Sequence, residues 1–355
     1  MKLKLSVCII TRNEVLKLER CLTSIASIAD EIVVVDTGSE DQTIEICQKF
    51  TTKVFNYKWT DNFAAARNYA IAKATNDLIW MIDSDEVLKK VDFEILNDFI
   101  MNCKCSIGQV MRENYTKFNL GKESQIKTEY ISRIFSRKYY EYMGRVHEQL
   151  IRKNSFESKG TYVKLPLVIE HDGYEKSKVL EAKARRNLRL LKLDLIDHPQ
   201  DPYIFYQIGK SLNVLKKDKL ATIYLKEALT YEKDVRKNYV YDCVEALGYT
   251  FNRLRQMQLG IALLKKYSLY KVLADYCFLL GLLQMNTGLF DQAVASFLQA
   301  TKCQSFRTVG TNGFLAYYNI GVIYEVLGKK QYARAFYQKC GAYKLAKKGL
   351  ERISD

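Results

Sequence analysis

The stretch Asp77-Leu-Ile-Trp-Met-Ile-Asp-Ser-Asp-Glu86 decides the fold predicted for the first half of this 355-residue chain. Residues 78–82 form a continuous apolar run without polar alternation, which is typical of a strand buried on both faces of a parallel sheet. Acidic residues follow it at the carboxyl end, where open α/β sheets bind ligands. On an extended backbone Asp83 and Asp85 would point to different sides, so one could meet a ribose hydroxyl and the other a divalent cation. A solvated surface turn is the alternative interpretation of so short a pattern.

Strands and helices alternate through the first 90 residues. The sequence predicts strands at 3–10, 31–35, 54–57 and 78–82, and helices at 15–28, at 44–50 and from Asp61 or Asn62 onward. Short connections in this order predict a right-handed, doubly wound parallel sheet, that is, an α/β domain.

Polar clusters follow three of these strands, at residues 11–14, 36–41 and 83–86. The carboxyl ends of parallel strands share one edge of the sheet, so we expect the clusters to meet in one crevice. No Gly-x-Gly-x-x-Gly follows the first strand, which argues against a dinucleotide site. Side chains would hold a nucleotide instead: Asp36 accepting from the base, Arg67 reaching the base or a phosphate, and Asp83 on the ribose.

Four motifs, in this order and at this spacing, resemble the amino-terminal half of family 2 glycosyltransferases of the GT-A fold. They are Ser6-Val-Cys-Ile-Ile-Thr-Arg-Asn-Glu14, Val33-Val-Val-Asp-Thr-Gly-Ser-Glu-Asp41, Ala64-Ala-Ala-Arg-Asn68 and Asp83-Ser-Asp85. The resemblance implies inverting transfer of a hexose from a UDP-sugar, with UDP-glucose expected, and Mn²⁺ or Mg²⁺ held by Asp85 on the diphosphate. The donor-binding residues that it implies are Thr11, Asn13, Glu14, Asp36, Gly38, Ser39, Arg67, Asp83 and Ser84.

Two of the three histidines lie in later motifs, Tyr142-Met-Gly-Arg-Val-His-Glu148 and Glu170-His-Asp-Gly-Tyr174. These motifs resemble a narrower group, the sublancin-type peptide glycosyltransferases, which attach sugars to Cys or Ser of glycocin bacteriocins. By this resemblance His171 completes the metal shell, and Glu148, preceded by His147, is the candidate general base. A lone histidine is more often a core or surface residue, which is the alternative for both.

The sequence changes character after Gly173. A helical apolar pattern runs from Leu180 to Leu195 and stops at His198-Pro199. Glycines then recur at equivalent positions, each with an apolar or aromatic residue sixteen positions later: Gly209 with Leu225, Gly248 with Leu264, Gly281 with Phe297, and Gly321 with Tyr337. This is the phase of the ~34-residue tetratricopeptide helix pair, and the copy near Tyr241 is degenerate.

We therefore expect a catalytic domain at 1–173, a connecting helix at 174–200 and an all-α tetratricopeptide-like domain at 201–355. The repeats could hold an acceptor peptide in a concave groove, or they could be a structural solenoid that holds the enzyme together or forms a homodimer. Fused repeats of this kind commonly bind extended peptides, which favours a protein acceptor over a lipid or free sugar.

Composition limits the class of protein. The formal net charge is +15, but lysines are spread over many elements and no basic run alternates with aromatic residues, so we expect no nucleic-acid partner. No apolar run approaches the ~18 residues of a membrane span. The basic residues at the amino terminus precede a short apolar run that reads as a strand. Nine scattered cysteines predict reduced thiols in a cytoplasmic protein.

Two other functions are compatible with the sequence. A transferase of this family could build a surface polysaccharide, a lipopolysaccharide core or a teichoic-type glycan. A tetratricopeptide scaffold with an inactive transferase domain is the second alternative, against which the intact Asp-x-Asp and Ala-Arg-Asn motifs argue. For a peptide acceptor, a thiol needs less help from a base than a hydroxyl, because a free cysteine with a pKa near ~8.5 is already partly ionised at neutral pH.

Overall fold

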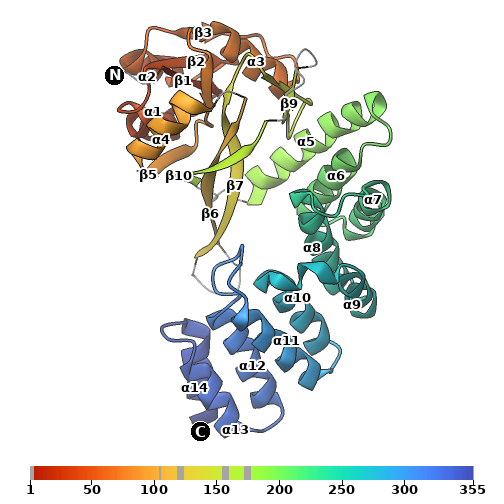
Figure 1. Ribbon diagram of the computed structural model, residues 1–355. Coiled ribbons are helices and arrows are strands. Elements are labelled where there is room, and N and C mark those ends of the chain that lie inside the picture. Colours follow the sequence, from red (N-terminus) through yellow and green to blue (C-terminus); the bar gives the residue numbers. More distant parts are fainter. Residues whose placement is uncertain (1–3, 104, 118–123, 154–159, 172–176, 355) are drawn as a thin grey trace. The chain divides into compact units, whose positions relative to one another are not determined.

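The computed structural model describes residues 4–103, 105–117, 124–153, 160–171 and 177–354 (Figure 1). The chain divides into two compact units. The first comprises Met1–Thr116 and Thr128–Glu175, and the second comprises Lys117–Lys127 and Lys176–Asp355. The boundary expected at Gly173 and the motif residues Asp172 to Tyr174 lie outside the described residues.

The first unit is built on an eight-stranded sheet with the order β3-β2-β1-β4-β7-β6-β10-β5. Its first four members are the predicted strands: β1 (Leu5–Thr11), β2 (Glu31–Asp36), β3 (Val54–Asn56) and β4 (Leu78–Met81). They pair in parallel, and Thr11 lies opposite Asp36 in the register of β1 and β2. The expected doubly wound α/β arrangement is therefore confirmed for this half of the sheet.

Helices cover both faces of the sheet. Successive strand residues point to opposite faces, and apolar residues at both sets of positions give each face its own core. In β1, Leu5, Val7 and Ile9 belong to one core with α1 (Val15–Ile25), α2 (Thr43–Phe50) and α4 (Phe93–Asn102). Cys8, between them, belongs to a second core with α3 (Phe63–Lys73). Asn62 caps α3 by accepting from Ala65 N at 2.9 Å, as one of the two predicted cap candidates.

The other half of the sheet is mixed. Strand β7 (Ser124–Ser136) is antiparallel to β4, and β10 (Tyr162–His171) is parallel to β6 (Ile107–Lys117). Strand β5 (Glu86–Val91) was not predicted; it begins at the last residue of the polar cluster 83–86 and pairs antiparallel with β10. A separate hairpin joins β8 (Tyr140–Met143) to β9 (Gln149–Arg152).

The second unit contains the helical repeats. The connecting helix α5 (Ser177–Asp197) ends before His198-Pro199, as predicted. The bounds of the following α-helices are α6 (Pro202–Val214), α7 (Asp218–Tyr231), α8 (Asn238–Arg253), α9 (Met257–Lys266), α10 (Ala274–Met285), α11 (Phe290–Lys302), α12 (Phe314–Val326), α13 (Lys330–Gln338) and α14 (Lys344–Ser354). A short 3-10 helix, Ser268–Val272, lies between α9 and α10.

The predicted repeat phase corresponds to close helix packing. A β-carbon built on Gly281 would lie 2.8 Å from the ring of Phe297, sixteen residues later, and one built on Gly321 would lie 2.5 Å from Tyr337. The same spacing holds for Gly209 and Leu225. In the degenerate copy the neighbour of Gly248 is Leu279 instead. Glycine is therefore required at these positions so that paired helices can approach.

All nine cysteines are free thiols, and most are buried. Among the helices that the structure describes, none is both long and apolar enough to cross a membrane.

Candidate active site

The acidic residues after β4 form a closed turn. Glu86 N donates to Asp83 O at 3.0 Å, and Asp83 N donates to the Glu86 carboxylate at 3.1 Å. Glu86 is fully buried. The sequence-based reason for the divergence of Asp83 and Asp85 was wrong, because residues two apart on an extended strand point to the same side. The two carboxylates diverge because β4 ends at Met81 and they lie on a turn.

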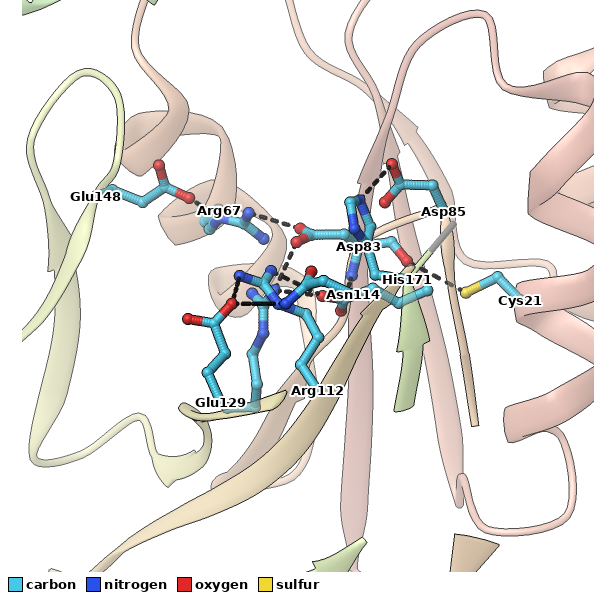
Figure 2. A network of polar contacts seen from close by, with 11 residues as sticks. Cys21, Arg67, Asp83, Asp85, Arg112, Asn114, Glu129, Glu148 and His171 are labelled. Carbon is cyan, nitrogen blue, oxygen red and sulfur yellow. Dashed lines mark hydrogen bonds and ion pairs between the residues drawn. The ribbon is translucent and has the colours of Figure 1, made fainter. Parts of the chain in front are cut away.

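Asp83 lies between two guanidinium groups (Figure 2). Arg67 Nη2 donates to Asp83 Oδ1 at 2.7 Å, and Arg133 Nη2 donates to Asp83 Oδ2 at 2.5 Å. Burial disfavours the charged carboxylate, but Arg133 and Arg67 outweigh it and hold the pKa of Asp83 well below its ordinary value. Asp83 is therefore an anion at any physiological pH, and both of its oxygens are oriented by the protein.

Arg67 also reaches Glu148, its second carboxylate partner (Figure 2). Its Nε donates to Glu148 Oε1, across 81 positions of sequence. The side chain of Glu148 is 11% exposed and that of Arg67 is 7% exposed. Arg67 Nη1 is buried without a hydrogen-bond partner. One guanidinium thus links the turn after β4 to the loop between β8 and β9, so the structure brings the predicted residues Arg67, Asp83 and Glu148 together.

The β8–β9 hairpin is also fastened to α3 by its backbone. Asn68 Nδ2 donates to Tyr142 O at 2.9 Å, and Tyr142 N donates to Asn68 Oδ1 at 2.9 Å. Phe63 N donates to Arg145 O at 2.8 Å. These bonds explain the Ala-Arg-Asn motif physically: its arginine binds the carboxylates of the site, and its asparagine fixes the backbone that carries Glu148.

Asp85 faces a different group of side chains from Asp83. His171 Nε2 lies 3.3 Å from Asp85 Oδ2, and Lys17 Nζ lies 3.9 Å from the same oxygen. The hydrogen bond to Asp85 raises the pKa of His171; burial opposes the ionisation of Asp85, but its hydrogen bond with His171 keeps its own pKa below the ordinary value. The two predicted metal ligands are therefore adjacent.

These two groups fit a divalent cation. A carboxylate oxygen and an imidazole nitrogen are both ligands that Mn²⁺ accepts. Within the described residues, no three His, Cys, Asp or Glu side chains form a cluster that could hold a metal by themselves. A cation here would need further ligands from a bound diphosphate or from water, as is usual for Mg²⁺ at phosphate sites.

The first two polar clusters form one interlocked pair of loops. Asp36 is buried, and its carboxylate accepts from Gly38 N and Ser39 N, both at 2.9 Å, as well as from the Ser39 hydroxyl. Asn13 N donates to Ser39 Oγ at 2.9 Å, and its side chain accepts from Glu40 N at 2.8 Å. Gly38 has a φ of 107°, which favours glycine.

The other predicted residues of this edge are placed as follows. Thr11 is buried, and its hydroxyl has no hydrogen-bond partner. Glu14 N donates to Thr43 Oγ1 at 2.9 Å. Ser84 is buried inside the acidic turn. His147 has a φ of 54°, and its carbonyl accepts from Gln149 Nε2 at 2.9 Å.

Sequence reasoning missed the arginines of β6 and β7. Arg133 Nη2 also donates to Glu86 at 2.9 Å, and Arg112 contacts Glu86 at 3.4 Å and Glu129 at 2.7 Å. The available signal was the alternation of Ile131, Arg133 and Phe135, which places a charged residue on an apolar face if the segment is a strand. A buried charge needs a partner of opposite charge, so a buried Arg133 indicates that carboxylates lie next to it.

Family models match both parts of the chain. Residues 6–159 match the family described as glycosyl transferase family 2, and residues 274–304 and 315–340 match the tetratricopeptide repeat. Within solved structures, the helical half is similar to the crystal structure of MamA, with a TM-score of 0.40 and 20% identity, covering 51% of this chain and 98% of that chain.

Curated relatives match by sequence. A "TPR repeat-containing protein" of Synechococcus elongatus is 32% identical over 236 residues, which is 64% of this chain and 56% of that protein. The prophage-derived glycosyltransferase SunS of Bacillus subtilis is 28% identical over 256 residues, 67% of this chain and 56% of that protein. An uncharacterized glycosyltransferase of Rickettsia bellii is 39% identical over 87 residues, 24% of this chain and 29% of that protein. The chain thus spans just over half the length of the first two relatives.

Proposed function

Because the chain carries a family 2 glycosyltransferase domain followed by tetratricopeptide repeats, we propose that it transfers a hexose, with inversion, from a UDP-sugar to Cys or Ser of a bacteriocin-type peptide. UDP-glucose is the donor we expect. The observation that carries the proposal is the position of Arg67 between Asp83 and Glu148, beside the Asp85–His171 pair. This arrangement joins a donor-binding turn, a cation site and a carboxylate base in one group.

The donor would be held by the edge formed by β1, β2 and β4. The buried Thr11 hydroxyl and the loop around Asp36 are suited to the uridine, and Asp83 to the ribose. Asp85 and His171 would hold Mn²⁺ or Mg²⁺, which when bound neutralises charge developing on the leaving diphosphate. Arg67 Nη1 is the one buried donor of its guanidinium without a partner, and it would bind the nucleotide.

The acceptor side would be formed by the β8–β9 loop. Arg67 holds one oxygen of Glu148, which fixes the direction of the carboxylate. The same carboxylate is then positioned to take the proton of an attacking thiol or hydroxyl. His147 precedes it on a strained backbone, which supports a role in shaping the loop.

A peptide acceptor is supported by the relation to SunS and by the repeats. The seams between paired helices use the glycine and aromatic pairs typical of tetratricopeptide arrays. Such arrays present extended binding surfaces. We assign the repeats to acceptor binding, and not to homodimer formation alone.

Intact-mass measurement of peptides tests this function. The full chain is incubated with Mn²⁺, a panel of nucleotide sugars, and peptide pairs that differ only in Cys or Ser. A gain of one hexose mass with UDP-glucose, absent in Asp85→Asn, is the expected result. Donor hydrolysis without any peptide product would favour a glycan acceptor, and no donor turnover or binding would favour the scaffold alternative.

A further inference from the structure

We propose that Arg133 is a positioning residue of the acidic turn, and that it holds Asp83 and Glu86 so that Asp85 faces the cation. The inference rests on the proposed function. No sequence motif includes Arg133, which lies on β7.

The contacts of Arg133 are short and shielded from solvent. One nitrogen, Nη2, donates to Asp83 Oδ2 at 2.5 Å and to Glu86 Oε1 at 2.9 Å. Arg133 is 8% exposed and Glu86 is fully buried. Two carboxylates that would otherwise repel each other in a low-dielectric site are thus joined by one cation.

The pairing of β4 with β7 determines where the guanidinium group of Arg133 lies. In the antiparallel pairing of β4 and β7, Trp80 lies opposite Ile134. Arg133 is the next residue of β7 toward the carboxyl end of β4, which is where the acidic turn begins. Its guanidinium therefore projects from a rigid central strand, and the turn takes its position from the sheet.

The turn itself depends on Glu86. The same carboxylate that Arg133 binds through Oε1 accepts from Asp83 N through Oε2. Asp85 lies between the two residues that Arg133 binds, and its own side chain has a separate partner in His171. Holding both ends of the turn fixes the direction of Asp85 without contacting its carboxylate.

Neighbouring arginines cannot replace this arrangement. Arg112 reaches Glu86 only at 3.4 Å and binds chiefly the exposed Glu129. Arg67 binds Asp83 but not Glu86. Among the described residues, Arg133 is the arginine that contacts both ends of the turn at 3 Å or less.

The test compares UDP binding with and without Mn²⁺ by calorimetry, in the full-length protein. Arg133→Lys keeps the charge but cannot place an N–H on both carboxylates at guanidinium geometry. Metal-free UDP affinity can fall too, because Arg133 also holds Asp83 of the proposed ribose site. We therefore compare ratios, and we expect the factor by which Mn²⁺ strengthens UDP binding to fall at least about tenfold beyond that loss. Arg137→Lys is the matched control, because Arg137 follows the same strand but binds away from the acidic turn: it donates to the backbone carbonyls of Ile71 and Ala74 and lies 3.8 Å from Asp77. It should lower the melting temperature without changing the Mn²⁺ factor.

The outcomes test the positioning role of Arg133 separately from the proposed cation site. An unchanged Mn²⁺ factor in Arg133→Lys, or an equal fall in Arg137→Lys, overturns the positioning role. If Arg133→Lys does not fold, Glu86→Gln replaces it; it keeps an oxygen for Asp83 N but removes the charge facing Arg133, and an unchanged factor there overturns the role as well. A wild-type protein that binds UDP equally with and without Mn²⁺ instead contradicts the proposed cation site itself.

Discussion

Arg67 binds Glu148 with one nitrogen and Asp83 with another, so the carboxylate of the β8–β9 loop and that of the acidic turn share one buried cation. Burial opposes the charge of Arg67, but Asp83 and Glu148 together raise its pKa above the ordinary value. In the proposed function, the same side chain would therefore set the geometry of the donor side and that of the acceptor side.

Arg67→Lys should impair both sides at once. An ammonium group cannot donate in the two fixed directions that the guanidinium uses. We expect kcat/KM to fall by at least about 100-fold, with KM raised for donor and for peptide, as measured by initial rates. Arg20→Lys is the control, since Arg20 is exposed and lies 3.9 Å from Glu170. A change confined to one substrate would contradict the shared role.

Asp85→Asn should reduce transfer alone, whereas Asp83→Asn should also reduce the stability of the protein. Asp85→Asn should nearly abolish transfer with little change in melting temperature, and EDTA should reproduce the effect on the wild type. Asp83→Asn should also reduce stability, by about 3 kcal/mol, because it leaves buried Arg67 and Arg133 without their shared anion. Thermal unfolding and activity measured side by side separate the two. Full activity in excess EDTA would rule out the cation.

Glu148→Gln should distinguish thiol from hydroxyl acceptors. A positioned base contributes typically about 10²- to 10⁴-fold when the acceptor is a hydroxyl. Transfer to a Cys peptide should be lost only in part, and it should recover as the pH rises toward the pKa of a free thiol, ~8.5. The comparison uses two peptides that differ only at the acceptor residue. Equal losses at every pH would assign Glu148 a structural role, as the partner of Arg67.

Much of the fold could be predicted because it depends on local patterns. The apolar run 78–82 predicted β4, and the glycines at 281 and 321 predicted the helix seams. Strand β5 could not be predicted, because its place at the far edge of the sheet depends on pairing with β10, whose paired residues lie 76 to 85 positions later. Arg133 was missed for the same reason: a charge on an apolar strand face has meaning only when its partners are known.

Acid should weaken the first unit through Glu31. Although burial disfavours its charge, hydrogen bonds from Lys53, Ser6 and Thr75 lower the pKa of Glu31 from 4.5 to about 2. The folded-state pKa is the lower one, so the stabilisation is complete above about 4.5 and is lost as the pH falls toward about 2. It amounts to about 3 kcal/mol at most.

Denaturant unfolding of Glu31→Gln at several pH values tests this. The variant should be less stable than the wild type at pH 7, and the difference should shrink between pH ~4.5 and ~2. The exposed Glu94→Gln of α4 provides the comparison and should show no such convergence. A constant difference across this range would show that the charge of Glu31 is not the cause.

Gly281→Ala should destabilise the second unit by about 1–3 kcal/mol. The new β-carbon would lie 2.8 Å from the ring of Phe297, which is fully buried and cannot move aside freely. Phe297→Leu in the same chain should recover part of the loss, because it removes the ring atoms. Thermal unfolding of both single variants and the double variant measures the coupling. Strict additivity would show that the two residues do not clash.

The glycine and aromatic seam of the repeats has a consequence for how such a chain can change length. Helices α10 and α11 meet through Gly281 and Phe297, and α12 and α13 meet through Gly321 and Tyr337. In both pairs, a glycine of the first helix packs against an aromatic ring of the second helix. An additional pair of this kind would therefore contain its own internal packing. We therefore expect the length of the array to change in whole helix pairs, because each pair of such an array contacts only its neighbours.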